Sequence, residues 1–284
     1  MKILKYFFQS IFIYSFFLII RIIGLNISRK IFSVLFNLIG PFARNKKMIL
    51  KNLSSFPRNI SMIEKKQIIK DMWSNYGMTF VEYIFLKKFR NASNHISIKG
   101  DEIIQKVKDK NKPVIFISGH FANFELMSME ITKKKIQLAT IYRPLNNYFL
   151  NPFMERLRKR YICKNQIKKG IRGVRESIDY IKKGYSVALM IDQRVSEGEL
   201  INFFGKPALT STLPAQLAIK FKLNIVPVFI KRTKNNNFEL EFHEEIDTSS
   251  EKDKTELTKN LNLILERMIV KNPNQWIWTH NRWK

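Results

Sequence analysis

Two apolar stretches near the amino terminus are typical of helices that meet a membrane. Residues 6–20 carry no charge, and apolar character returns over residues 27–39. The first stretch is shorter than the roughly 20 residues of a clean transmembrane helix, but Lys5 and Arg21 at its ends can extend their charges toward water. We expect either a tilted transmembrane helix or a helix lying in the membrane interface. No small-residue cleavage site follows, which disfavours a cleaved signal peptide.

From residue 61 onward, short apolar runs alternate with amphipathic segments. Apolar positions among charges over residues 62–87 predict an amphipathic helix. Strands are predicted at residues 96–99, 113–117, 136–142, 186–191, 224–230 and 238–242. Further helices are predicted at residues 101–110, 122–133, 147–161, 171–183, 212–222 and 251–271. This alternation predicts an α/β fold with a mixed, mostly parallel central sheet flanked by helices.

Glycines mark the expected breaks in these elements. A break at Gly40-Pro41 should end the second apolar helix, so residues 1–60 form a helical anchoring segment and residues 61–284 a main domain. Two other glycine-containing stretches, residues 169–173 and 204–207, are predicted turns. Neither stretch matches a dinucleotide-binding or phosphate-loop fingerprint.

Charge indicates which partners the chain meets. The net charge is +27, while 45% of the residues are apolar and 13% aromatic, so a folded, strongly basic protein faces an anionic partner. No Asp or Glu precedes Glu64, whereas ten Lys or Arg do, seven of them after Arg21. By the positive-inside rule the body is cytoplasmic, against an anionic leaflet. Cys163 is the single cysteine, which excludes a disulfide framework and a cysteine-rich zinc site and fits a reducing compartment.

The candidate chemistry begins with His120, which follows the apolar run 113–117. Glu125 lies at the start of the next predicted helix, and the two can meet if His120 occupies the loop at the carboxyl end of the strand, where open α/β sheets bind ligands. An imidazole is well placed to take a proton near neutral pH, and a carboxylate would hold its tautomer. A base with no nucleophile of its own suggests transfer to a substrate hydroxyl. For the other three histidines, at positions 95, 243 and 280, we expect hydrogen-bonded core positions.

Three further polar residues follow predicted strands or precede helices. Arg143 should lie at the end of a strand, where an arginine can clamp a phosphate or stabilise an oxyanion. Asp192 ends another buried strand, where it can position Arg143 or substrate hydroxyls, or cap the next helix. Asn123 is either a helix N-cap or an oxyanion donor.

The order of these motifs resembles the lipid A biosynthesis acyltransferase family, the lauroyl and myristoyl transferases of the wider lysophospholipid and glycerol-phosphate acyltransferase superfamily. The signature is His-x4-Glu, here His120 and Glu125. Other matching blocks, in order, are Asn52-Leu53 with Phe56-Pro57 and Glu82, residues 141–147, Asp192-Gln193 with residues 203–208, Val226-Pro227-Val228, and residues 278–284. Phe124 stands where many relatives carry Trp, and Gln193 where they carry His, which bears on substrate and acyl-chain preference.

The resemblance implies a membrane-bound acyltransferase, with residues 61–284 as its acyltransferase domain. It would move a fatty acyl group from acyl carrier protein, or from acyl-CoA, to a hydroxyl of a lipid A precursor at the cytoplasmic face of the bacterial inner membrane, without an acyl-enzyme. His120 would be the general base and Glu125 its orienting group. Arg143, Asp192, Gln193 and Asn123 would bind substrate. No metal or organic cofactor is expected.

The alternatives differ in acceptor or in class. The acceptor can instead be another glycolipid, an amino-acid lipid or a lysophospholipid. The basic charge suits an acidic carrier protein, a phosphorylated glycolipid or the anionic leaflet. A membrane-associated nucleic-acid-binding protein is disfavoured because the aromatic residues concentrate in the anchor and in apolar runs. Residues 201–204 either line an acyl-chain pocket or belong to the core.

Overall fold

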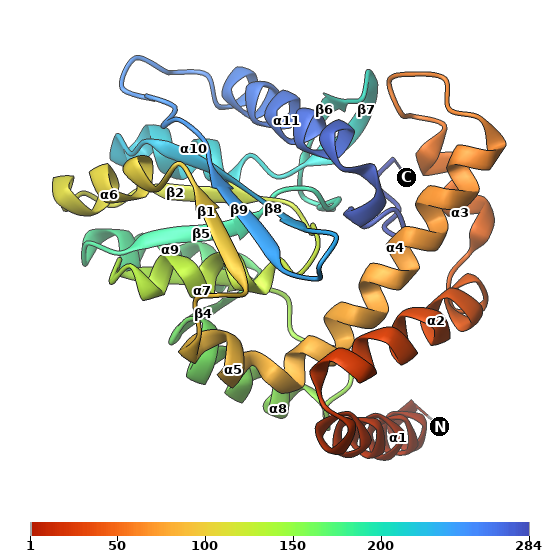
Figure 1. Cartoon of the computed structure of the whole chain (residues 1–284). Helices are drawn as coiled ribbons and strands as arrows, with labels where there is room; N and C mark the ends of the chain where they lie inside the picture. The colour runs from red at the N-terminus through yellow and green to blue at the C-terminus, as the bar shows by residue number, and fades with distance from the viewer. Residues whose placement is uncertain (1, 284) are drawn as a thin grey trace.

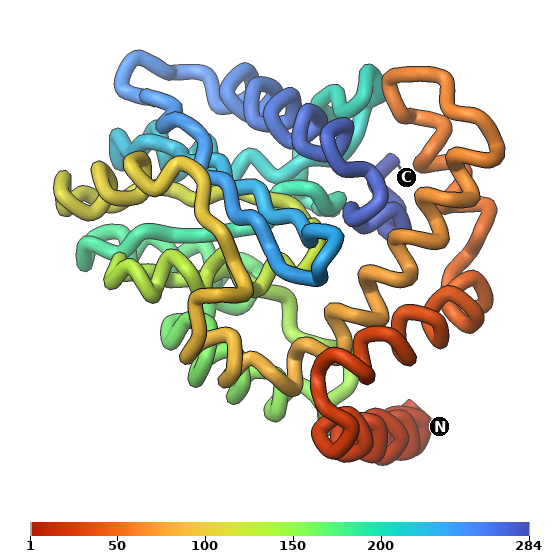
Figure 2. Tube along the Cα trace, viewed as in Figure 1, coloured from red at the N-terminus to blue at the C-terminus, as the bar shows by residue number. Residues whose placement is uncertain are grey.

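Figure 1 shows a computed structural model of the chain, in which residues 2–283 are described. Four helices form the amino-terminal part. They are α1 (Lys2–Ile23), α2 (Leu25–Ala43), α3 (Lys46–Leu53) and α4 (Met62–Glu82). Gly24, with φ of 87°, lets the chain turn between α1 and α2. In Figures 1 and 2, α2 runs beside α4 and α1 lies across the lower end of this pair.

The break expected at Gly40-Pro41 is wrong, because α2 continues to Ala43. Gly40 serves packing instead: a Cβ there would lie 2.2 Å from a ring carbon of Trp73 on α4. Pro41 cannot donate the helical hydrogen bond to the carbonyl of Asn37, and the helix ends two residues later, at Ala43.

A seven-stranded sheet forms the centre of the molecule, with strand order β1-β9-β8-β2-β5-β3-β4. Its strands are β1 (Ile96–Lys99), β2 (Ile115–Ser118), β3 (Leu138–Tyr142), β4 (Asn165–Lys168), β5 (Ser186–Met190), β8 (Ile225–Arg232) and β9 (Phe238–Phe242). Only the β8–β9 pair is antiparallel among these described strands. The predicted mixed, mostly parallel α/β sheet is confirmed, and all six predicted strands are present.

Three strands were not predicted. β4 is short and polar, and β6 (Glu199–Phe203) pairs with β7 (Lys206–Thr210) in a separate hairpin. Phe204 and Gly205, with φ of 51° and 68°, form the turn of this hairpin. The turn predicted over residues 204–207 is therefore confirmed at its first two residues, because Lys206 and Pro207 already belong to β7. The turn predicted over residues 169–173 is confirmed only at its start, because α9 begins at Ile171.

The remaining helices cover the sheet. They are α5 (Leu86–Asn91), α6 (Asp101–Lys110), α7 (Glu125–Lys133), α8 (Asn151–Leu157), α9 (Ile171–Lys182), α10 (Leu213–Phe221) and α11 (Lys254–Lys271). Figure 1 shows α10 and α11 on one side of the sheet and α7 on the other. The helix predicted over residues 147–161 is shorter: α8 is followed by a π-helical turn, Arg158–Ile162. Likewise, a 3₁₀ turn, Tyr83–Phe85, separates α4 from α5 within the predicted helix 62–87.

The amino-terminal helices share a core with the main domain. Phe17 of α1 and Phe32 of α2 both stack near Phe80 of α4, with ring centroids 5.1 and 5.7 Å away. Ile20 is fully buried, whereas most of the other apolar side chains of α1 are exposed. One stripe of α1 therefore faces the protein and the rest of its apolar surface faces outward.

Candidate functional site

Five neighbouring strands of the sheet end at one edge, and each contributes a polar residue there. Arg232 ends β8, His120 follows β2, Asp192 follows β5, Arg143 follows β3 and Lys169 follows β4. Parallel strands place their carboxyl ends together, which is where open α/β sheets bind ligands. This edge is therefore the candidate active site.

The closest pair at this edge is His120 and Asp192. The register aligns Ser118 with Met190, and His120 and Asp192 each lie two residues beyond these strand ends. His120 Nδ1 lies 2.7 Å from Asp192 Oδ1, and the His120 backbone N–H donates to Oδ2 at 2.9 Å. The indole N–H of Trp276 donates to the same Oδ2 at 2.9 Å. Three contacts thus hold one carboxylate against the imidazole.

These contacts determine the protonation of the pair. Asp192 is only 1% exposed, and burial alone would raise its pKa, but the interactions with His120 and Trp276 outweigh burial and lower it. An ionised carboxylate only accepts hydrogen bonds, so Nδ1 of His120 carries a proton. In the neutral ring Nε2 is then the nitrogen with a free lone pair.

The predicted contact between Glu125 and His120 is wrong. Glu125 is the first residue of α7, and its carboxylate instead accepts from Tyr83 Oη at 2.6 Å and from Arg158 Nε at 2.8 Å. Burial alone would lower the pKa of Arg158, but the charge of Glu125 raises it. The pair is a buried ion pair beside the site, and Asp192 occupies the place predicted for Glu125.

The alternatives for Asn123 and Asp192 are also revised. Phe124 precedes α7 and the helix has no side-chain N-cap, so Asn123 is not a cap. Its amide nitrogen donates to the buried carboxylate of Glu82 at 2.9 Å. Asp192 does not cap a helix, because the chain after β5 leads into β6. Nor does it position Arg143, since its hydrogen bonds go to His120 and Trp276.

A small, mostly apolar cavity of about 40 Å³ lies beside the imidazole. Phe124 packs edge-on against His120, with ring centroids 4.6 Å apart. The lining residues come from α4, the loop after β2 and the carboxyl-terminal segment: Asn75, Tyr76, Thr79, His120, Ala122, Phe124, Gln275 and Ile277. A space of this size can hold only a small group, so it suits the reacting group of a substrate beside the imidazole, with apolar walls around it.

The loop that carries His120 is held in an uncommon conformation. Ala122 has φ of 43°, a left-handed value that residues with a Cβ rarely adopt. Its carbonyl accepts from Asn75 Nδ2 at 3.3 Å and Thr79 Oγ1 at 3.2 Å, and its N–H donates to the Gln275 carbonyl at 3.1 Å. Such a conformation persists only when its surroundings enforce it, so α4 and the carboxyl-terminal segment fix this loop.

The role of that carboxyl-terminal segment was missed from the sequence. Asn52 of α3 donates to the carbonyls of Trp278 and His280 at 2.8 and 2.7 Å, and Tyr76 pairs with Thr279 at 3.1 Å. These contacts join the Asn52 block to the final block, and Trp276, which precedes that block, donates to Asp192. The clustered tryptophans near the carboxyl terminus were the available signal.

Arg143 and Lys169 form a basic pair at the ends of β3 and β4. The Lys169 backbone N–H donates to the Tyr142 carbonyl at 2.9 Å, and both basic side chains are exposed. Burial of part of the side chain, and then the charge of Arg143, lower the pKa of Lys169. Lys169 was not singled out from the sequence. Gln193, beside Asp192, is partly exposed at the same edge.

The other three histidines lack some of the hydrogen bonds that were expected for core positions. Within residues 2–283, both ring nitrogens of His95, Nε2 of His243 and Nδ1 of His280 have no hydrogen-bond partner. The prediction of hydrogen-bonded core histidines is therefore wrong for these nitrogens. Burial lowers the pKa of both His95 and His280 to about 4, which keeps them neutral.

Phe203 and Phe204 belong to the core rather than to the cavity beside His120. Both are buried and pack against Trp283, with ring centroids 5.7 and 6.4 Å away. Of the two alternatives for residues 201–204, the core alternative holds for these rings. Within residues 2–283, no group of three or more His, Cys, Asp or Glu side chains is placed to hold a metal ion.

Known proteins share this sequence pattern over most of the chain. A family model described as bacterial lipid A biosynthesis acyltransferase matches residues 1–284. The lipid A biosynthesis palmitoleoyltransferase of Escherichia coli is 23% identical over 252 residues, covering 86% of this chain and 80% of that protein. The lipid A biosynthesis myristoyltransferase of the same organism is also 23% identical over 252 residues, with 84% and 75% covered.

One solved structure gives a weaker match. The 1-acyl-sn-glycerophosphate acyltransferase PlsC of Thermotoga maritima aligns with a TM-score of 0.44 and 16% identity, covering 89% of this chain and 100% of that chain. The family match spans every block described above, from Asn52 to the carboxyl-terminal tryptophans. The chain belongs to the bacterial lipid A biosynthesis acyltransferase family.

Proposed function

We propose that the protein transfers a fatty acyl group from a thioester, of acyl carrier protein or of CoA, to a hydroxyl of a lipid A precursor. The observation that carries the proposal is the imidazole of His120, oriented by the buried carboxylate of Asp192 and facing an apolar cavity. The names of the relatives support the lipid A acceptor. In the proposed reaction the acceptor hydroxyl attacks the thioester directly, and no side chain among residues 2–283 forms a covalent intermediate.

The reaction follows from the tautomer. Nε2 of His120 takes the proton of the acceptor hydroxyl as its oxygen attacks the thioester carbonyl carbon. Asp192 stabilises the imidazolium that forms. Collapse of the tetrahedral intermediate breaks the carbon–sulfur bond, and the departing sulfur takes the proton from the imidazolium. An ester and a free thiol result, and His120 is again neutral.

The other site residues have supporting roles in this proposal. Arg143 and Lys169 bind a phosphate of the acceptor at the ends of β3 and β4, and Gln193 contacts the acceptor beside them. Glu125 is a positioning residue that acts through Arg158, and Asn123 positions the His120 loop through Glu82. An acidic acyl carrier protein would meet the same basic surface.

We infer that the helical segment 1–60 attaches the enzyme to the membrane. α1 is apolar enough to cross a bilayer, with a mean hydropathy of 1.8, and only 17% of that stretch is buried. The exposed apolar side chains of α1, α2 and the loop before α8 include Phe7, Phe8, Phe12, Leu18, Ile22, Ile27, Ile31, Val34, Leu38, Phe42, Leu145, Tyr148 and Phe149. Monomeric soluble proteins rarely expose so much apolar surface, which supports a lipid-facing role.

Hydrogen bonds along α1 favour an interfacial helix over a spanning one. Ser10 Oγ donates to Asn147 Oδ1 at 3.0 Å, Asn147 Nδ2 donates to the Tyr6 carbonyl at 2.9 Å, and Tyr14 Oη donates to the Phe149 carbonyl at 2.8 Å. These hydrogen bonds hold the side of α1 against the loop before α8. α1 would have to break them and separate from the rest of the protein in order to cross the membrane. We infer that α1 lies in the cytoplasmic leaflet, with residues 61–284 on the cytoplasmic face.

The direct test is acyl transfer by the purified full chain. Labelled acyl carrier protein thioester or acyl-CoA is offered with a lipid A precursor, another glycolipid, an amino-acid lipid and a lysophospholipid, and the product is identified by mass spectrometry. We expect an ester of the lipid A precursor, and loss of that product in His120→Ala. Exclusive labelling of another acceptor would overturn the substrate, and full activity of His120→Ala would overturn the mechanism.

A further inference from the structure

A second polar cluster lies away from His120, where two arginines share one carboxylate. Glu82 is fully buried; Arg29 Nε donates to its Oε1 at 2.7 Å, and Arg232 donates to both of its oxygens. The nearby carboxylate of Glu130 is already paired with Lys133 at 2.8 Å. The cluster thus has two positive charges for one negative charge, and an uncompensated buried charge is costly.

The excess charge is located on Arg29. Arg232 is also bonded to Asn75 and Thr79, whereas Nη2 of Arg29 is buried without a hydrogen-bond partner within residues 2–283. Arg29 is only 5% exposed. Burial lowers its pKa, an effect that Glu82 opposes and Arg232 adds to. A guanidinium held in this way is better stabilised when a second anion reaches it.

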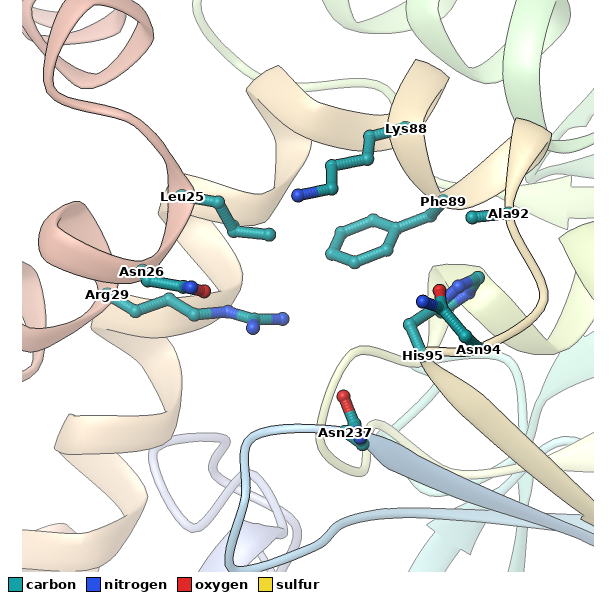
Figure 3. A pocket seen from close by; sticks show the side chains of 9 residues that line it. All are labelled: Leu25, Asn26, Arg29, Lys88, Phe89, Ala92, Asn94, His95 and Asn237. Atoms are coloured by element: carbon teal, nitrogen blue, oxygen red, sulfur yellow. The ribbon is translucent and has the colours of Figure 1, made fainter.

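Arg29 lines a cavity of about 220 Å³, so a ligand in that space lies next to its guanidinium, although Nη2 itself is buried. Figure 3 shows Arg29 from α2, Lys88 from α5 and Asn237 from the turn before β9 reaching into the same space. Phe89 and His95 form the buried wall, and both ring nitrogens of His95 lack a partner within residues 2–283. Every hydrogen-bonding side chain that these elements present here can donate, and none is a carboxylate.

This donor set suits a phosphate group. Arginine matches phosphate geometry with two N–H groups, lysine adds a point charge, and asparagine adds an amide N–H. The cavity holds several times the roughly 30 Å³ that one water molecule occupies in the liquid, so a phosphate fits. It is separate from the cavity beside His120, with which it shares no lining residue.

The mouth of the cavity lies beside the outward apolar surface. Asn26, which lines it, belongs to the first turn of α2, and the neighbouring side chains of Ile22 and Ile27 are 77% and 57% exposed. We propose that this cavity binds the phosphate group of a membrane lipid, with the acyl chains of that lipid along the apolar surface of α1 and α2. The lipid source rests on the proposed membrane attachment; the phosphate site does not.

Binding also has a route to the reaction centre. Glu82 joins Arg29 to Asn123, which lies three residues after His120, and Arg232 joins Glu82 to Asn75, which holds the Ala122 carbonyl. A phosphate that relieves the excess charge on Arg29 would stiffen this network. Binding of the phosphate itself can be measured without acyl transfer.

The experiment is calorimetric titration of the full-length protein with soluble dihexanoyl phosphatidate, dihexanoylglycerol and inorganic phosphate at constant ionic strength. We expect phosphatidate to bind and dihexanoylglycerol, which lacks the phosphate, to bind at least about tenfold more weakly. Phosphatidate binding tighter than inorganic phosphate identifies a lipid headgroup as the source, whereas equal binding supports the site but identifies free phosphate.

Lys88→Gln and Lys87→Gln are the matched variants, because both are exposed on α5 and only Lys88 lines the cavity. Lys88→Gln should weaken phosphatidate binding about tenfold, the effect of one lost charge-assisted hydrogen bond, and Lys87→Gln less than about twofold. Equal weakening by both variants would indicate diffuse electrostatic attraction and overturn the site. The absence of phosphatidate binding to the unaltered protein would overturn the site as well.

Arg29→Gln separates binding from folding. It leaves Glu82 paired with Arg232, so we expect the thermal midpoint to change little while phosphatidate binding is lost. Arg232→Gln removes the partner that holds both carboxylate oxygens and should unfold the protein at a much lower temperature. Retained binding in folded Arg29→Gln would overturn the proposal.

Discussion

His120 and Asp192 are 72 residues apart in sequence, yet Nδ1 of the imidazole lies 2.7 Å from the carboxylate. Asp192 also accepts from the backbone N–H of His120, so it positions both the ring and the loop that carries it. Trp276 completes the arrangement from the carboxyl-terminal segment. A base whose carboxylate partner is fixed by three hydrogen bonds is pre-organised for proton transfer, which makes this pair the first target for mutation.

Asp192→Asn should lower kcat by about 10⁴-fold with little change in KM, the loss that this change causes in a Ser-His-Asp triad. An amide cannot stabilise the imidazolium and favours the wrong tautomer. Acyl-transfer kinetics measure this change. Asp179→Asn, on the exposed surface of α9, is the matched control and should behave as the unaltered enzyme. A less than about threefold effect of Asp192→Asn would refute the role of Asp192.

Glu125→Gln should act mainly on stability. It leaves the buried guanidinium of Arg158 without a carboxylate, which costs about 3 kcal/mol in the free energy of unfolding. The double variant Glu125→Gln/Arg158→Met removes both charges and should recover much of that loss, as measured by urea denaturation. If Glu125 instead acts on His120 directly, Glu125→Gln would lose as much kcat as Asp192→Asn, and the double variant would recover none of it.

Lys169→Met and Arg143→Met should raise KM for a phosphorylated acceptor by about tenfold each, with a much smaller effect on kcat. Each variant removes one charge-assisted contact to the phosphate. Lys182→Met, on an exposed position of α9, is the control for general charge loss. Steady-state kinetics with phosphorylated and dephosphorylated acceptors provide the measurement. An equal rise for both acceptors would argue against phosphate binding at this edge.

Protein stability should fall as the pH decreases from about 6.5 to 4, partly through His95. Burial lowers the pKa of His95 from 6.5 to about 4, so between these values the unfolded chain binds more protons than the folded one. The full contribution is about 3 kcal/mol, present above the unfolded pKa and lost as the pH falls to the folded value. Urea denaturation across this range should show a shallower slope for His95→Gln. An unchanged slope would show that His95 does not contribute.

Cysteine labelling can distinguish an interfacial α1 from a spanning one. The single native cysteine, Cys163, is buried, so the background reaction should be low. If α1 is interfacial, an impermeant maleimide should label Lys2→Cys in inverted inner-membrane vesicles but not in spheroplasts. Lys182→Cys, on the body of the protein, should show the same labelling and serves as the cytoplasmic reference. Reaction of Lys2→Cys in spheroplasts alone would show that α1 crosses the membrane.

Local patterns determined much of this structure. Short apolar runs predicted β2, β3, β5 and β8, because a strand buried in a parallel sheet is apolar on both faces. β1 and β9 instead alternate apolar and polar residues. The polar β4 and the β6–β7 hairpin lacked a comparable apolar run. α2 continues past Gly40 because the ring of Trp73 packs against that glycine. Trp73 lies 33 residues away in sequence, so the residues around Gly40 do not reveal this contact.

The sequence alone identified His120, the positions of Arg143 and Asp192 after strands, the basic apolar anchor and the family resemblance. Only the tertiary structure decided which carboxylate meets the imidazole. Glu125 is near in sequence but begins a helix that faces Arg158, whereas the pairing of β2 with β5 places Asp192 beside His120. Strand order arises from packing over the whole chain, so contacts between distant loops cannot be derived from spacing along it.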